Sequence, residues 1–172
     1  MQSSAKKIAY SATFTAVSVG AIVASRYLPI TITALLACSV CYFLCLKRCG
    51  IGYGLLCIVA SLVVSFVLGG VGTVFLLDAV LFAPYSLLAF LMKKLPYLGK
   101  KAVIRAGIIV IFANIVFALI YYLLALHISY DFVVMSERFG GYAVLAVMVS
   151  GFALVTDYLF WQATEYFIKR FR

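Results

Sequence analysis

Positive charge alternates with apolar sequence along this chain, and that alternation constrains the fold more than any other feature. Of the 14 Lys and Arg residues, all but Arg26 and Arg138 lie near the termini or in the second and fourth gaps between apolar stretches. Loops rich in Lys and Arg stay on the cytoplasmic side of a membrane. We therefore expect both termini in the cytoplasm and the sparsely charged loops outside. The expected spans are residues 8–25, 29–46, 51–68, 73–92, 106–126 and 140–168.

The composition excludes a soluble fold. Hydrophobic residues make up 67% of the sequence and charged residues only 11%, whereas soluble domains contain roughly 25% charged residues. A helix satisfies its own backbone hydrogen bonds in lipid. We therefore predict an all-α membrane protein, a six-transmembrane-helix bundle that forms one integral domain over residues 1–172. The net charge of +9 suits loops beside anionic lipid headgroups, so no nucleic-acid partner is expected.

Motifs typical of enzymes and metal sites are missing from the sequence. Cys38 and Cys41 form a CxxC pair, but neither a histidine nor a second CxxC accompanies them. We therefore expect no metal and no cofactor, and we interpret the five cysteines as packing residues. No His-Glu-x-x-His, Gly-x-Ser-x-Gly or Gly-rich phosphate-binding motif occurs. The chain is thus not expected to be an enzyme, with a small intramembrane aspartyl enzyme as a weak alternative.

Three polar residues within the predicted spans are functional candidates, because polar groups in lipid are costly. Counting about 1.5 Å per residue, Asn114 and Asp157 fall near the same depth in neighbouring spans, which predicts a polar core pair. This pair is either a clamp between helices or the floor of a cavity or proton site. Asp78 falls nearer the outer end of its span, with Tyr85 two turns further along the same face.

Two interpretations of Asp78 stand side by side. Its carboxylate either contacts a ligand near the outer mouth, or it reaches the interface or pairs with Arg26 or Arg138. Tyrosines also gather at the predicted outer ends, where they form an aromatic belt or line a pocket that stacks on a flat ligand. The candidate ligand-binding residues are Asp78, Tyr85, Tyr121, Tyr122 and Arg138.

Small residues recur every four positions in the first span, at Ala12, Ala16, Gly20 and Ala24. Such a stripe lets two helices approach closely. It serves either packing inside the bundle or docking of a helix from another protein, for which Ala12, Ala16 and Gly20 are the candidates.

The Ala-x-x-x-Ala motif from Ala12 to Ala16 resembles one found in the substrate-binding S component of energy-coupling-factor (ECF) vitamin transporters. The basic start from Ala5 to Ala9 is also similar to that family, and the run from Asp78 to Tyr85 is loosely so. The resemblance implies a six-helix, multi-pass protein of the bacterial cytoplasmic membrane. Its first helix would dock a coupling transmembrane subunit that works with ATPase subunits. Its substrate would be a vitamin or related small molecule captured from outside.

A structural membrane scaffold of the cell-wall elongation machinery is the alternative function. Such a scaffold has a comparable topology and similar helix-docking stripes, but it needs no ligand pocket. A closed outer cavity lined by Asp78, tyrosines and the loop of Arg138 would distinguish the transport subunit from the scaffold.

Overall fold

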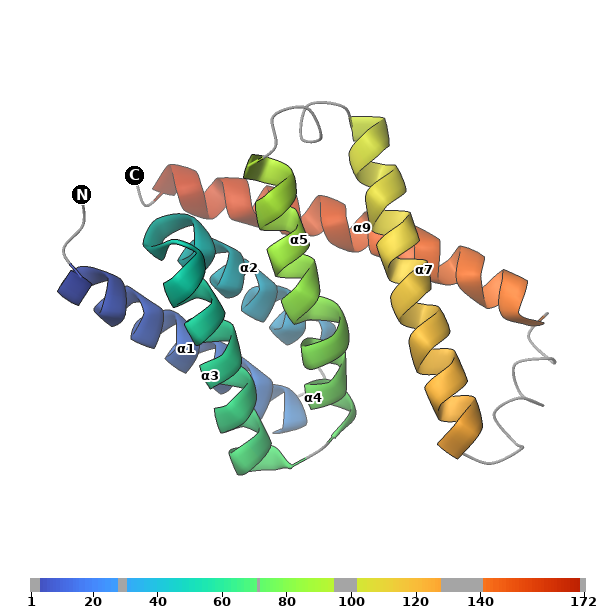
Figure 1. Ribbon diagram of the computed structural model, residues 1–172, viewed down its shortest axis with the longest axis horizontal. Coiled ribbons are helices and arrows are strands. Elements are labelled where there is room, and N and C mark those ends of the chain that lie inside the picture. The colour runs from blue at the N-terminus through green and yellow to red at the C-terminus, as the bar shows by residue number, and fades with distance from the viewer. Residues whose placement is uncertain (1–3, 28–30, 71, 95–101, 128–140, 171–172) are drawn as a thin grey trace. The chain divides into compact units, whose positions relative to one another are not determined.

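The computed structural model describes residues 4–27, 31–70, 72–94, 102–127 and 141–170, and every regular element within these ranges is a helix. The side chains at 26, 69, 73, 102, 120–127 and 141 lie outside the described set. The all-α prediction is confirmed. The elements are α1 (Ser4–Tyr27), α2 (Thr31–Cys49), α3 (Ile51–Gly69), α4 (Thr73–Leu77), the π-helix η1 (Asp78–Phe82), α5 (Ala83–Lys94), α7 (Ala102–His127) and α9 (Gly141–Arg170) (Figure 1).

Five helical stretches among the described residues are long and apolar enough to cross a membrane. They are Ser4–Ser25, Thr31–Cys49, Ile51–Leu68, Val74–Lys94 and Tyr142–Arg170. The remaining predicted span corresponds to α7, whose apolar stretch is described over the shorter range Val103–Leu119. The count of six spans and the cytoplasmic position of both termini therefore stay predictions.

Several polar side chains are buried among the described residues, and many large apolar side chains are exposed. Serines supply much of the buried polar set, for example Ser11, Ser18, Ser39, Ser61 and Ser65. The outward face of α3 carries exposed Leu56, Val59, Val63 and Val67, which follow the i, i+3, i+4 spacing of one helix face. A water-soluble protein rarely exposes apolar patches of this kind. Together with the five apolar helices, this distribution indicates a multi-pass membrane protein.

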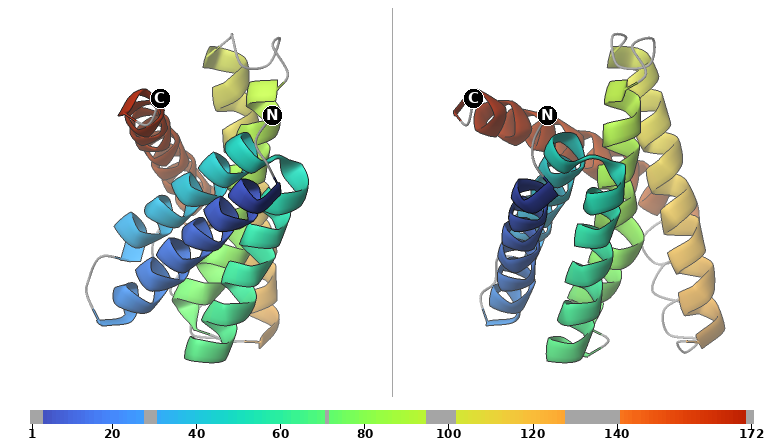
Figure 2. Two further views of the ribbon diagram at one scale, coloured as in Figure 1. Left: turned by 90° about the vertical axis from the view of Figure 1, so that its left-hand side faces the viewer. Right: turned by 60° about the vertical axis from the view of Figure 1, so that its left-hand side comes forward.

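The chain forms two compact units, which are described separately. Residues 1–96 and 162–172 make up unit 1, and residues 97–161 make up unit 2; the single domain predicted for residues 1–172 stays a prediction. In unit 1, α2 contacts α1, α3 and α5, and the two views in Figure 2 show α1 and α2 side by side. The hydrophobic core of unit 1 is formed by Ile22, Cys38, Tyr42, Cys45, Leu46, Cys49, Cys57, Ile58 and Ala83.

Two glycines allow α2 and α3 to fold back on each other. Gly50 has φ of 92°, a left-handed conformation that glycine adopts without steric cost, and its N–H donates to the carbonyl of Leu46 at 3.2 Å. At Gly54, a Cβ atom would lie 2.9 Å from Cα of Leu46. The two helices thus meet at a distance that only glycine permits.

Pro84 explains why the helix from Thr73 to Lys94 contains a π-helical segment. Proline has no N–H, and its ring collides with the carbonyl four residues earlier, which is that of Val80. A regular α-helix cannot accommodate this collision without bending or widening. The turn before Pro84 is accordingly wider, over Asp78–Phe82, and the Ala83 N–H donates to the carbonyl of Asp78 five residues back. A single proline thereby sets the local geometry around Asp78.

Unit 2 contains α7 and the part of α9 up to Trp161. Several side-chain contacts between described residues join the two helices. Arg105 pairs with Asp157, and Asn114 bonds to Ser150. The rings of Phe117 and Tyr142 stack with centroids 5.6 Å apart. In these contacts, residues with higher numbers on α7 meet residues with lower numbers on α9, so the two helices run antiparallel.

Candidate functional site

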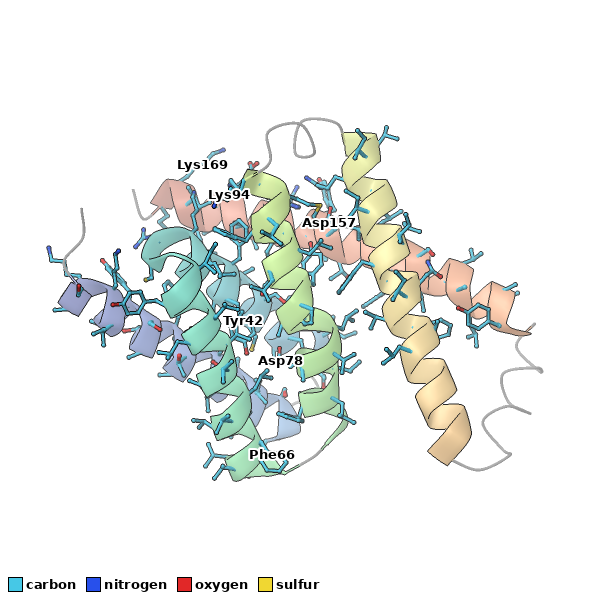
Figure 3. All side chains as sticks on the ribbon, viewed as in Figure 1. Tyr42, Phe66, Asp78, Lys94, Asp157 and Lys169 are labelled. Atoms are coloured by element: carbon cyan, nitrogen blue, oxygen red, sulfur yellow. The ribbon has the colours of Figure 1, made fainter. Side chains whose placement is uncertain are left out.

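Asp78 lies in the interior of unit 1 with no exposed surface. Its Oδ2 atom accepts a hydrogen bond of 2.9 Å from the hydroxyl of Tyr42 on α2. Figure 3 shows the two labelled side chains close together between α2 and the α4–η1 segment. The Oδ1 atom has no hydrogen-bond partner among the described residues. We call these two residues the Asp78–Tyr42 pair.

Helix α2 holds the π segment at both of its ends. One turn before Tyr42, the hydroxyl of Ser39 donates to the backbone carbonyl of Phe82 at 3.4 Å. Tyr42 binds the first residue of η1 and Ser39 binds the last, so α2 runs antiparallel to this segment. Buried backbone and side-chain polar groups require such partners. The two bonds therefore fix the position of Asp78 relative to α2.

The structure describes the neighbours of Asp78 but not its depth in a membrane, so its place near the outer mouth stays a prediction. Its partner Tyr42 lies eleven residues into α2, about 17 Å along that helix, and complete burial of Asp78 excludes a carboxylate that reaches the interface. Tyr85 is also buried in unit 1. Pairing of Asp78 with Arg26 or Arg138 cannot be compared with the structure, since both side chains lie outside the described set.

Three candidate ligand-binding residues fall where the structure describes no side chain. Tyr121 and Tyr122 belong to the end of α7, but their side chains are outside the described set, and Arg138 lies in the undescribed range 128–140. The aromatic pocket and the lid contact at the outer end thus stay predictions.

Asn114 and Asp157, which we predicted as a polar pair, each bind a different residue of the opposite helix. The Asn114 amide donates to the Ser150 hydroxyl at 2.8 Å and to the carbonyl of Val110 at 2.8 Å. Asp157 is buried, and its Oδ2 accepts a hydrogen bond of 2.6 Å from Arg105. Both residues do join α7 to α9, as the clamp interpretation anticipates, although through separate contacts.

Arg105 was not among the predicted site residues, because its position next to Lys100 and Lys101 indicates a basic cytoplasmic loop. Its guanidinium bonds to Asp157 and also lies 5.1 Å from the centre of the Trp161 ring, a distance typical of a cation–π contact. Trp161 follows Asp157 by one turn, so both partners stand on one face of α9. A carboxylate in an apolar helix beside an arginine at the start of the preceding helix is a signal that sequence alone could have supplied.

Tyr42 was also missed, because the tyrosines were assigned mainly to the outer interface. Its position in the middle of the apolar range 29–46 was the available signal. A buried tyrosine hydroxyl requires a hydrogen-bond partner, and carboxylates inside the membrane are few in this sequence.

Helix α1 has two faces of different character. Ser11, Ser18 and Ile22 are buried against the rest of unit 1, and the hydroxyl of Ser11 donates to the carbonyl of Tyr53 on α3 at 3.2 Å. The opposite face holds the small residues of the stripe. We call it the small-residue face, and its exposed members are Ala5, Ala9, Ala12, Ala16 and Gly20.

All five cysteines are free thiols. Cys57 accepts a hydrogen bond of 3.3 Å from the hydroxyl of Thr15, and the Cys38 thiol donates to the carbonyl of Ser18 at 3.4 Å. These contacts join α1 to its neighbours, as expected for packing residues. Across the described ranges, no cluster of three or more His, Cys, Asp or Glu side chains is arranged to hold a metal ion.

Comparisons of the chain with protein-family models, with curated proteins and with solved structures give no match.

Proposed function

We propose that this chain is the substrate-binding membrane subunit of an ECF-type importer. In this function it captures a vitamin or related small molecule from outside and delivers it through an ATP-driven module. The partners are a coupling transmembrane subunit and its ATPase subunits, because the chain has no nucleotide-binding motif of its own. The membrane is the bacterial cytoplasmic membrane.

The observation that supports this proposal is the exposure of the small-residue face of α1. Packing inside the bundle was the competing explanation for the stripe, yet Ala12, Ala16 and Gly20 are exposed. A Cβ atom added at Gly20 would meet no heavy atom within 4 Å. These three residues are therefore not buried by the helices of unit 1.

An exposed stripe of Ala and Gly is suited to contact with another transmembrane helix. Leu, Val and Phe face lipid elsewhere in this protein, whereas small side chains leave the backbone open to close approach by another helix. Packing between two such helices is driven by van der Waals contact rather than by the hydrophobic effect, because lipid is as apolar as the helices. A transmembrane helix of the coupling subunit fits this face.

The test is co-purification of the tagged chain with the coupling and ATPase subunits. Ala16→Leu places a bulky side chain on the small-residue face, so we expect co-purification and substrate uptake to fall at least tenfold. Val17→Leu is the matched control, because Val17 is exposed on α1 but stands outside the stripe. An Ala16→Leu protein that folds, binds its partners and supports uptake as well as the control would refute the docking face.

The membrane scaffold alternative shares the docking face but not the ligand. It predicts partners from the cell-wall elongation machinery in the same co-purification, and no bound small molecule. The identity of the captured partners therefore separates the two functions.

A further inference from the structure

Asp78 is a buried acid without a basic partner among the described residues. The ion pair that the structure describes joins Arg105 to Asp157, in the other unit. The Asp78–Tyr42 pair has a single hydrogen bond of 2.9 Å, and Oδ1 of Asp78 remains unbonded within the described part of the chain. Neither Asp78 nor Tyr42 has any exposed surface.

The elements packed against η1 are α2, α4 and α5, and their titratable groups near Asp78 are ordinarily uncharged. Helix α2 contributes Cys38 and Tyr42, and α5 contributes Tyr85, whereas α4 has no titratable side chain. Thiols and phenols are neutral at pH 7 in water. None of these groups balances a carboxylate charge.

The Lys and Arg side chains at the ends of α2 and α5 do not pair with Asp78 among the described contacts. Lys93 comes fifteen residues after Asp78, about 22 Å along the helix, and its ammonium lies 5.5 Å from the centre of the Phe43 ring. The guanidinium of Arg48 lies 5.6 Å from the centre of the Tyr10 ring. Lys47 and Lys94 are exposed. An ionised Asp78 would therefore stand in an apolar interior with one hydrogen bond.

An ionised carboxylate in such a place is strongly disfavoured, and in practice the group is neutralised instead. Metal cations in proteins are held by several ligands, but no group of three or more His, Cys, Asp or Glu side chains that could hold a metal ion occurs among the described residues. An ammonium group needs room beside the carboxylate, and both side chains here are completely enclosed. A proton needs neither ligands nor room.

We propose that the Asp78–Tyr42 pair is a proton-binding site inside unit 1. Asp78 carries a proton while the site is closed, and the Tyr42 hydroxyl orients the carboxyl group through Oδ2. The proton leaves to water only when the helices around η1 separate and water reaches Asp78. Closure then takes up one proton, and by linkage any change that opens the site favours its release. This function is independent of the docking face and of ATP, and thus goes beyond the proposed import role.

Infrared spectroscopy of the full chain tests the proposal directly. A protonated carboxyl group has a C=O stretching band that a carboxylate lacks, and a detergent without ester groups leaves this spectral region clear. We expect the wild-type protein at neutral pH to show the band and Asp78→Asn to lose it. Tyr42→Phe retains the ring but removes the hydrogen bond, so the band should persist at a shifted frequency.

Asp157→Asn is the matched control, because Asp157 is also buried but has the guanidinium of Arg105 beside it at 2.6 Å. This substitution should leave the band unchanged. Wild-type and Asp78→Asn spectra without a carboxyl difference at neutral pH would overturn the proposal, and so would loss of the band in Asp157→Asn. If Asp78→Asn does not fold, the frequency shift in Tyr42→Phe decides: an unshifted band means that the protonated group is not Asp78.

Discussion

At the residue scale, the two buried aspartates of the described ranges have opposite surroundings. Asp157 has a guanidinium at 2.6 Å, whereas Asp78 has a phenol at 2.9 Å. Both aspartates were predicted from the sequence to be costly polar residues in apolar spans, but their partners were not predicted. Partners on different helices depend on how the helices rotate and slide against each other, and short sequence motifs do not encode that. Tyr42 and Arg105 were visible in the sequence, but their contacts were not.

Removal of the guanidinium from the Arg105–Asp157 pair should destabilise the protein. Breaking a fully buried ion pair costs about 3–5 kcal/mol, and we expect about 1–3 kcal/mol for Arg105→Ala because water reaches the Arg105 side chain, which is 28% exposed. Thermal unfolding in detergent measures this loss. Combining Arg105→Ala with Asp157→Asn removes the unpaired charge, so the double variant should recover part of the stability. Strictly additive losses would show that the two side chains are not energetically coupled.

At the element scale, the predicted spans match the observed helices closely. The predicted range 51–68 corresponds to the helix Ile51–Gly69, and 29–46 corresponds to Thr31–Cys49. The agreement is close because long apolar runs and the Lys47–Gly50 turn are strong local signals. The π segment was not predicted, although Pro84, which causes it, is evident in the sequence. A proline predicts a distortion but does not say whether the helix kinks, ends or widens.

The close contact between α2 and α3 predicts a specific difference between two glycines of the same helix. Gly54→Ala would place a methyl group against the side chain and Cα of Leu46, so the helices must separate, at a cost of about 1–3 kcal/mol. Gly52→Ala meets no heavy atom within 4 Å and should be neutral or slightly stabilising. Thermal unfolding of the two variants checks the difference. Equal stabilities would contradict the close approach at Gly54.

At the scale of the whole molecule, the uneven distribution of positive charge predicts the orientation in the membrane. Reporter fusions after Arg48, Lys101 and Arg172 should report the cytoplasm, and fusions near Gly70 and Asp131 should report the outside, because Lys- and Arg-rich loops are retained in the cytoplasm. A reversed signal at one of these positions would break the model of six spans with both termini inside. Exposure of the small-residue face to a partner in the membrane requires no particular orientation, so this test is independent of docking.

The central claim, capture of a small molecule from outside, is tested most directly by native mass spectrometry of the purified chain. We predict a bound molecule of vitamin-like mass at one per chain, either co-purified or added from a panel of vitamins. The Ala16→Leu variant should retain this molecule, because in the proposed function α1 docks the partner and does not contact the ligand. If the folded wild-type protein binds neither a co-purified molecule nor any member of the panel, the import function is contradicted and the scaffold function is favoured.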